Sequence, residues 1–250
     1  MYQAGIPVSA AFTGVEATGR DSAWAVGVRL RGVSTYTGAF AARWNGKRWR
    51  LVTLPVRNFL PETVAASSPA DVWIFGFVIR PAGQPNSAGM VLHLVGQHWR
   101  RVHLPPQPPN TWNQGTAMQA LVFGPRDVWL SGGAQTSTAG TLQTQIWRWS
   151  GTRWSSTELP GLLRTLSGNS ISDMWATSTA RDSGGGAARL YRFVSPGWSR
   201  QPAPSLIEAN VAVHSPADVW LTGFTNRQHS GRTASPAAWP AFPVRRPPGQ

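Results

Sequence analysis

A tryptophan recurs along this chain two residues after an aspartate, and this repeat constrains the fold more than any other feature. The copies read Asp-Val-Trp or Asp-Met-Trp, and they end at Trp73, Trp129, Trp175 and Trp220. A degenerate copy, Ser-Ala-Trp, ends at Trp24, and the steps between successive copies are 49, 56, 46 and 45 residues. Self-similarity at a period of about 40 to 50 residues indicates a toroidal or solenoid array built from one repeated unit.

A second motif follows each of the first four tryptophans. It places an aromatic residue or a leucine five residues before another tryptophan, with a glycine between them, as in Trp44-Asn-Gly-Lys-Arg-Trp49. Glycine in such a short connection is typical of a β-hairpin turn, and Asn-Gly is its strongest signal. A proline follows shortly after each of these hairpins and ends the last strand, because it cannot donate a ladder hydrogen bond. The closing tryptophans are Trp49, Trp99, Trp154 and Trp198.

The flanking segments are short, and they either alternate in polarity or run apolar, as in residues 72–77. No window sustains a helical apolar period, so the sequence predicts an all-β chain. Four antiparallel strands in about 45 residues make one propeller blade. We therefore expect a β-propeller over residues 1–225 with about five units, followed by a disordered, basic, proline-rich tail over 226–250. The units lie near 10–55, 60–105, 118–160, 165–204 and, in part, 206–225.

The sequence leaves two arrangements of these units open. In one, residues 2–7 resemble an outgoing strand and complete the last blade, which closes a ring of about five blades. In the other, the chain is a fragment of a larger ring of six or seven blades. An unclosed array exposes sheet faces at both ends, so it predicts self-association.

Composition narrows the function classes. The 250 residues carry a net charge of +13 and no cysteine, so no thiolate chemistry or disulfide is available. No apolar stretch is long enough for a membrane span, and no signal peptide is visible. The cations are arginines, except for Lys47, and they are scattered over the repeats. A nucleic-acid binder is expected to bunch its cations in a stripe, so we rank nucleic-acid binding third among the candidate functions.

The repeated acids and tryptophans are predicted to be structural. A short carboxylate at the start of a strand can accept backbone N–H groups in an Asx-type turn, which is the role expected for Asp71, Asp127, Asp173 and Asp218. Buried indoles in turn fill the space between blades. The remaining acids include no adjacent pair of the kind that a glycosidase uses. His93, His98 and His103 do not converge on strands, so neither a metal site nor a cofactor is expected.

The candidate ligand-binding residues are those that belong to neither of the two repeated motifs. Trp112 stands in a polar, proline-rich connection beside Asn110 and Asn113, and an aromatic ring there is a candidate for stacking on a sugar or peptide. Trp147 alternates with Trp149 and is therefore expected to point to the opposite face of its strand.

The motifs as a set resemble a known kind of repeat. The Ser-Pro-Ala-Asp-Val-Trp of residues 215–220 and the Trp-Ser-Gly-Thr-Arg-Trp of residues 149–154 look like the Trp-rich propeller repeats of actinobacterial proteins. Those repeats are similar to kelch and galactose-oxidase central domains, and the resemblance covers residues 10 to 224. It implies a propeller, and it implies an extracellular or cell-envelope location for an intact version. The copper ligands of galactose oxidase cannot be assigned here.

The sequence thus favours a non-catalytic propeller that displays variable loops to a protein or glycan ligand. Those loops are residues 79–90, 106–116, 131–145 and 178–187. Loops that vary on a repeated frame are where recognition is expected. The main alternative is a propeller-type glycoside hydrolase or lyase.

Overall fold

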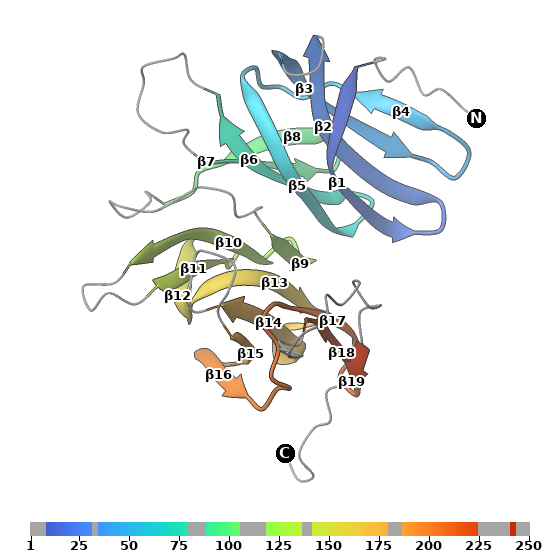
Figure 1. Cartoon of the computed structure of the whole chain (residues 1–250). Coiled ribbons are helices and arrows are strands. Elements are labelled where there is room, and N and C mark those ends of the chain that lie inside the picture. Colours follow the sequence, from blue (N-terminus) through green and yellow to red (C-terminus); the bar gives the residue numbers. More distant parts are fainter. Residues whose placement is uncertain are drawn as a thin grey trace, which may run out of the picture. The chain divides into compact units, whose positions relative to one another are not determined.

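The protein is almost entirely β-structure. The computed structural model describes residues 9–31, 35–79, 89–105, 119–136, 142–179, 187–224 and 241–243. These ranges contain nineteen strands, one short 3-10 turn, η1 (Ile171–Asp173), and no α-helix (Figure 1). The prediction of an all-β chain is confirmed.

The strands form five sheets, and in each sheet the spatial order of the strands follows the chain. The first blade is β1 (Ala10–Gly19), β2 (Ser22–Arg31), β3 (Thr35–Trp44) and β4 (Trp49–Val52), and the second is β5 (Phe59–Ser68), β6 (Asp71–Val78), β7 (Gly89–Val95) and β8 (His98–Val102). The third is β9 (Ala120–Gly124), β10 (Asp127–Thr136), β11 (Leu142–Trp149) and β12 (Trp154–Pro160), and the fourth is β13 (Leu162–Gly168), β14 (Met174–Thr179), β15 (Ala188–Val194) and β16 (Gly197–Gln201). The fifth contains β17 (Ala209–Ser215), β18 (Asp218–Gly223) and β19 (Ala241–Pro243). Four-stranded meanders of this kind are propeller blades, as the repeat predicts.

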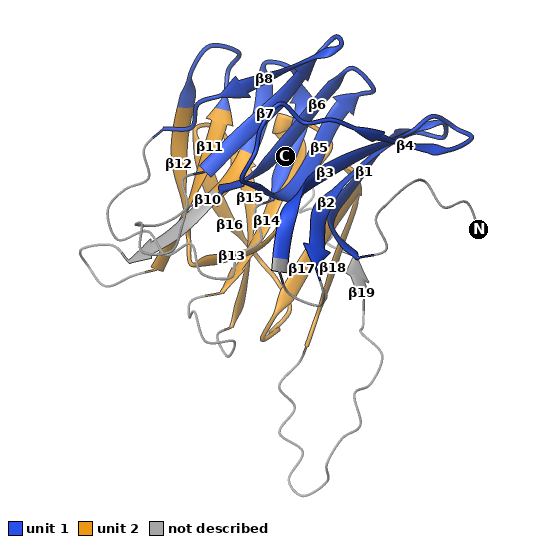
Figure 2. Cartoon of the chain, turned by 90° about the horizontal axis from the view of Figure 1, so that it is seen from above, with its two compact units in different colours: residues 1–106, 117–129, 149–154 blue, residues 107–116, 130–148, 155–250 orange. Residues whose placement is uncertain are grey.

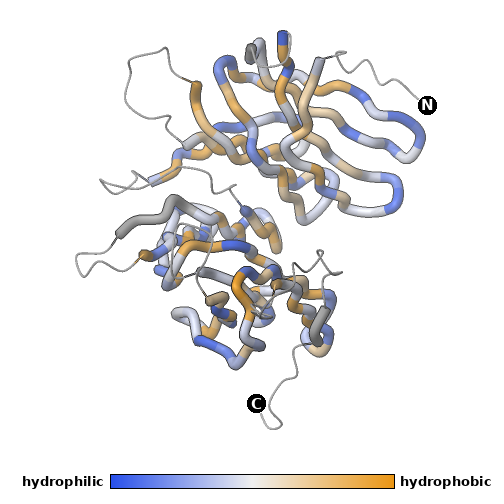
Figure 3. The backbone as a smooth tube through the Cα atoms, viewed as in Figure 1, coloured by the Kyte–Doolittle hydropathy of each residue, from blue (hydrophilic) through white to orange (hydrophobic). Residues whose placement is uncertain are grey.

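The hairpin between β3 and β4 shows how the second motif builds a turn. Gly46 has a φ of 86°, in the left-handed region that favours glycine. The side-chain Oδ1 of Asn45 accepts hydrogen bonds from the backbone N–H groups of Lys47 and Arg48, at 3.2 and 3.0 Å. These local features together stabilise the turn. In Figure 3 the tube is hydrophilic at this turn and at the turn between β1 and β2.

The chain divides into two compact units (Figure 2). Unit 1 comprises residues 1–106, 117–129 and 149–154, and unit 2 comprises residues 107–116, 130–148 and 155–250. Unit 1 thus holds the first two blades together with β9. Unit 2 holds the fourth and fifth blades.

Within unit 1, the core joins the first blade to the second. Trp24 on β2 belongs to one buried cluster with Val72 and Ile74, which lie on the central strand β6 of the next blade. Trp99 meets Trp24 edge to face, with ring centroids 5.7 Å apart. Each buried indole removes about 150–250 Å² from water, so these rings dominate the packing between blades.

Unit 2 has the same arrangement between the fourth and fifth blades. Trp175 on β14 clusters with Val211, Val219 and Leu221 of the fifth blade. The strand that opens each blade also contacts the opening strand of its neighbour, β1 with β5 in unit 1 and β13 with β17 in unit 2. The tryptophan of one blade therefore packs against the sheet of the following blade, as the sequence predicts.

The fifth blade departs from the expectation in two ways. Residues 241–243, inside the segment predicted to be a disordered tail, form β19 and pair with β18. Trp220, expected to be buried like the other repeat tryptophans, is 41% exposed. The rest of 226–250 and the segment 2–7, proposed to complete the last blade, lie outside the described residues.

Candidate functional site

The aspartate and tryptophan of the first motif bond directly to each other. The Nε1–H of Trp73 donates to Oδ1 of Asp71 at 2.9 Å. The same bond joins Trp129 to Asp127 at 3.0 Å, Trp175 to Asp173 at 3.3 Å, and Trp220 to Asp218. The sequence predicted that these carboxylates cap backbone N–H groups. The structure describes an indole N–H as a partner of the aspartate in all four copies, because residues two apart on a strand share a face, a spacing visible in the motif itself. The backbone cap stays a prediction.

Blade 1 has a serine where the other blades have this aspartate. Ser22 accepts a hydrogen bond from the Thr18 hydroxyl at 2.9 Å and does not reach the indole. The Nε1 of Trp24 is buried and has no hydrogen-bond partner among the described residues. A buried donor without a partner costs free energy, so the serine in place of aspartate makes the first blade less stable.

The second blade holds a polar cluster around Asp71. Asp71 accepts from Trp73, from the hydroxyl of Ser67 and from Nε2 of His93, the last at 2.7 Å. The His93 ring also stacks on the Trp73 ring, with centroids 3.7 Å apart and planes 16° apart. Burial raises the pKa of Asp71, but the hydrogen bonds from His93, Ser67 and Trp73 and the charge of His93 outweigh it and hold that pKa below its usual value.

This cluster contains a serine, a histidine and an aspartate, yet its connectivity is not that of a hydrolase. In a nucleophilic triad the serine hydroxyl bonds to the histidine, which acts as its base. Here the Ser67 hydroxyl and the His93 ring both bond to the same carboxylate, Asp71. The Ser67 hydroxyl is therefore bonded to a carboxylate and not to a histidine, and the same carboxylate fixes the Trp73 ring.

His93 is one member of a series that the sequence analysis missed. The cross-strand partners of Trp24, Trp73 and Trp175 are Arg43, His93 and Arg192. Arg43 and Arg192 lie over the indoles of their partners, at 5.8 and 5.7 Å from the ring centroids, in cation–π geometry. The signal was present in the sequence, because each of these three side chains directly precedes the aromatic residue or leucine that opens the hairpin motif.

Two glutamates of unit 1 lie on the opening strands β1 and β5. Burial raises the pKa of Glu16 and the pKa of Glu62. Glu62 occupies a bulge in β5 between Pro61 and Thr63, and bulges often re-aim a side chain beside a functional site. In unit 2, Glu208 pairs with Arg164 at 3.1 Å. No group of three potential metal ligands occurs among the described residues, and Asp182 lies outside them.

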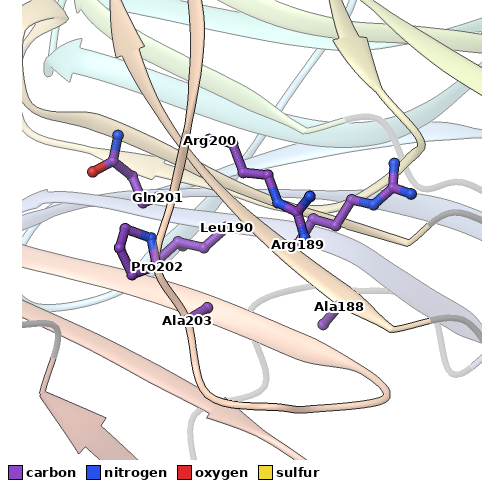
Figure 4. A pocket seen from close by; sticks show the side chains of 7 residues that line it. All are labelled: Ala188, Arg189, Leu190, Arg200, Gln201, Pro202 and Ala203. Carbon is purple, nitrogen blue, oxygen red and sulfur yellow. The ribbon is translucent and has the colours of Figure 1, made fainter.

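A hollow of about 450 Å³ lies at the β15–β16 hairpin of unit 2. Arg189 and Arg200 line it together with small, apolar and amide side chains (Figure 4). Its lining includes no acidic residue. The other lining residues are Ala188, Leu190, Gln201, Pro202 and Ala203.

Of the residues predicted to contact a ligand, the structure describes only Trp147. Trp112, Asn110 and Asn113 lie outside the described residues. Trp147 is only 1% exposed, so its ring packs in the interior and offers no face for stacking. The expectation that Trp147 and Trp149 point to opposite faces was wrong, because residues two apart on a strand share a face.

Comparisons with known proteins bear on the fold alone. No protein-family model and no curated protein matches this chain. Among solved structures it is similar to a GH74 xyloglucanase from Xanthomonas campestris, with a TM-score of 0.37 and 13% identity over 95% of this chain. The match covers 44% of that structure, so this chain spans less than half its length. The described residues contain no helix long and apolar enough to cross a membrane.

Proposed function

We propose that this protein is a non-catalytic β-propeller module that binds a protein or glycan ligand through the loops between its strands. The main support is that many of its carboxylates bond to other side chains within the fold. Four of the six aspartates accept indole N–H groups, and Glu208 pairs with an arginine. Five of the ten carboxylates therefore have structural partners.

The connections between the second and third strands support the same proposal. They span residues 32–34, 79–88, 137–141 and 180–187, and they share neither length nor composition. The strands that they join keep the same motifs. A rigid frame with unlike connections is the usual basis of recognition by loops.

The test compares loop variants with a frame variant. The purified protein is screened against a panel of polysaccharides and against candidate proteins. Residues 81–87 and, separately, 181–186 are then replaced by glycine–serine linkers of equal length. The matched control is Lys47→Ala in an exposed hairpin turn. We expect one or both loop variants to lose binding without a change in melting temperature, while the control binds normally. If neither loop variant changes the binding of any ligand, loop recognition is wrong.

A glycoside hydrolase or lyase is the second candidate, because Glu16 and Glu62 both have raised pKa values and lie on contacting strands. A raised pKa suits a general acid, and glycosidases pair two carboxylates within about 10 Å. The measurement is release of reducing ends or unsaturated products from the same polysaccharide panel, with Glu62→Gln and Glu16→Gln as variants. Turnover that both variants abolish would replace the binding proposal with the enzyme.

Location and assembly belong to the same proposal. The resemblance to actinobacterial repeat proteins supports an extracellular or cell-envelope location. Blades that are not covered by a neighbouring blade would expose apolar sheet faces and drive self-association. Sedimentation across a concentration series tests this, with a concentration-independent monomer as the contrary result.

A further inference from the structure

The hollow at the β15–β16 hairpin brings together two arginines on one face of the fourth blade. Tyr191 on β15 is the cross-strand partner of Arg200 on β16. Arg189 lies two residues before Tyr191, so it points to the same face. Arg189 and Arg200 are therefore diagonal neighbours, a placement within reach of long side chains. Figure 4 shows both side chains extending to the same side of the hairpin.

These two arginines differ from others of unit 2 in lacking partners. Arg164 pairs with Glu208, and Arg192 lies over Trp175 and donates to the carbonyl of Ser172. No hydrogen bond or ion pair joins the guanidinium of Arg189 or of Arg200 to another described side chain. Two guanidinium groups on one face of the hairpin repel each other, and a bound anion would offset that repulsion.

The surroundings suit a bound anion. Pro202 and Ala203 also line the hollow, so part of its wall is apolar, and charge-assisted hydrogen bonds to a guanidinium are among the stronger ones in proteins. A guanidinium presents its donors in a planar fork that matches carboxylate and phosphate oxygens. The volume of about 450 Å³ falls within the range of small-ligand sites.

We propose that this hollow is a binding site for an oxyanion, either a carboxylate or a phosphate group of a ligand, held jointly by Arg189 and Arg200. The site deepens the proposed binding function and rests on it, because it makes an acidic ligand the preferred class. The carboxylate source would be a uronic-acid saccharide, and the phosphate source a phosphorylated one.

The experiment titrates the full chain by calorimetry with two probes, inorganic phosphate and digalacturonate, in 0.15 M sodium chloride so that exposed charges are screened. The test variant is Arg189→Gln with Arg200→Gln. The control is Arg100→Gln with Arg101→Gln on β8, an exposed pair whose replacement changes the net charge equally. Maltose is the neutral probe.

We expect saturable binding of at least one anion, weakened about tenfold or more in the test variant and unchanged in the control, as loss of two charge-assisted hydrogen bonds predicts. The anion that binds more tightly identifies the source. Arg200→Lys keeps the charge without the fork and is expected to weaken carboxylate binding by a smaller factor. Equal losses in both double variants, or no saturable binding of either anion, would overturn the site. Because small ions are the probes, this result is independent of the loop variants that test the proposed function.

Discussion

The second and fifth blades carry the same Asp-Val-Trp motif in opposite environments. Trp73 is fully buried, whereas Trp220 is 41% exposed. Both indoles nevertheless donate to the aspartate two residues earlier. The hydrogen bond is therefore a property of the strand alone, which forms wherever the motif occurs. Burial is a property of the packing around it.

Around Trp73 that packing consists of several rings. His93 stacks on it, Phe75 lies parallel with centroids 6.2 Å away, and Trp149 meets it edge to face at 6.3 Å. The cross-strand partners of Trp220 are Ala212 and Pro243, and no cation is among them. The motif has the same local geometry in both blades, and the neighbours decide how much each copy contributes to stability.

The largest expected effect is that of Trp73→Ala. Removing a fully buried indole leaves a cavity that the surrounding rings cannot fill, so unfolding should become easier by about 3–5 kcal/mol. Chemical denaturation followed by circular dichroism measures the change. A loss below about 1 kcal/mol, the typical cost of any single substitution, would show that stacking around Trp73 contributes little.

The next largest effect is expected for Asp71→Ala. The change leaves the Trp73 indole N–H, the Ser67 hydroxyl and His93 without their shared acceptor in a buried place, at a cost of about 2–4 kcal/mol. Asp218→Ala removes the same bond from an exposed indole, which water can satisfy. Denaturation midpoints of the two variants give the comparison directly. Equal losses of stability in the two variants would mean that burial does not increase the contribution of the aspartate–indole hydrogen bond.

Acid should weaken the second blade through the same carboxylate. Because the pKa of Asp71 is lower in the folded state than in the unfolded state, its stabilising contribution is present above the unfolded pKa, about 3.9. That contribution is lost as the pH falls through the folded pKa. Urea midpoints between pH 6 and pH 2.5 should fall more for the wild-type protein than for Asp71→Asn, which has no charge there to lose. Parallel curves would contradict the assignment.

The first blade offers a gain of stability. Ser22→Asp restores the acceptor that Trp24 lacks, next to Arg43 on the facing strand. A new hydrogen bond from a buried donor to a charged acceptor is expected to add about 1–2 kcal/mol. Ser22→Asn supplies an acceptor without the charge and separates the two contributions. An unchanged or lowered melting temperature for both variants would indicate that the indole N–H already has a partner in solution.

The repeat alone predicted most of this frame. The motif spacing predicted four-stranded blades, the Asn-Gly turn predicted its hairpin, and the apolar run of 72–77 predicted a buried central strand. These features are local, so a sequence encodes them within a few residues. The pairing of β19 with β18 could not be predicted, because it joins segments separated by a connection without any strand signal. The Arg189–Arg200 hollow was missed for a related reason, since its two arginines meet only through the register of β15 and β16.

The smallest expected effect is that of Trp220→Ala, and it tests the comparison most sharply. The ring is already partly in water and has no stacking partner among the described residues, so its removal should cost less than about 1 kcal/mol. Acrylamide quenching supplies a second measurement, because an exposed indole is quenched efficiently, and Trp220→Phe should therefore remove an accessible component of the fluorescence. A loss as large as that for Trp73→Ala would mean that Trp220 is covered in solution. If that loss grows with protein concentration, the cover is a second copy of the chain, since only an intermolecular contact makes stability depend on concentration.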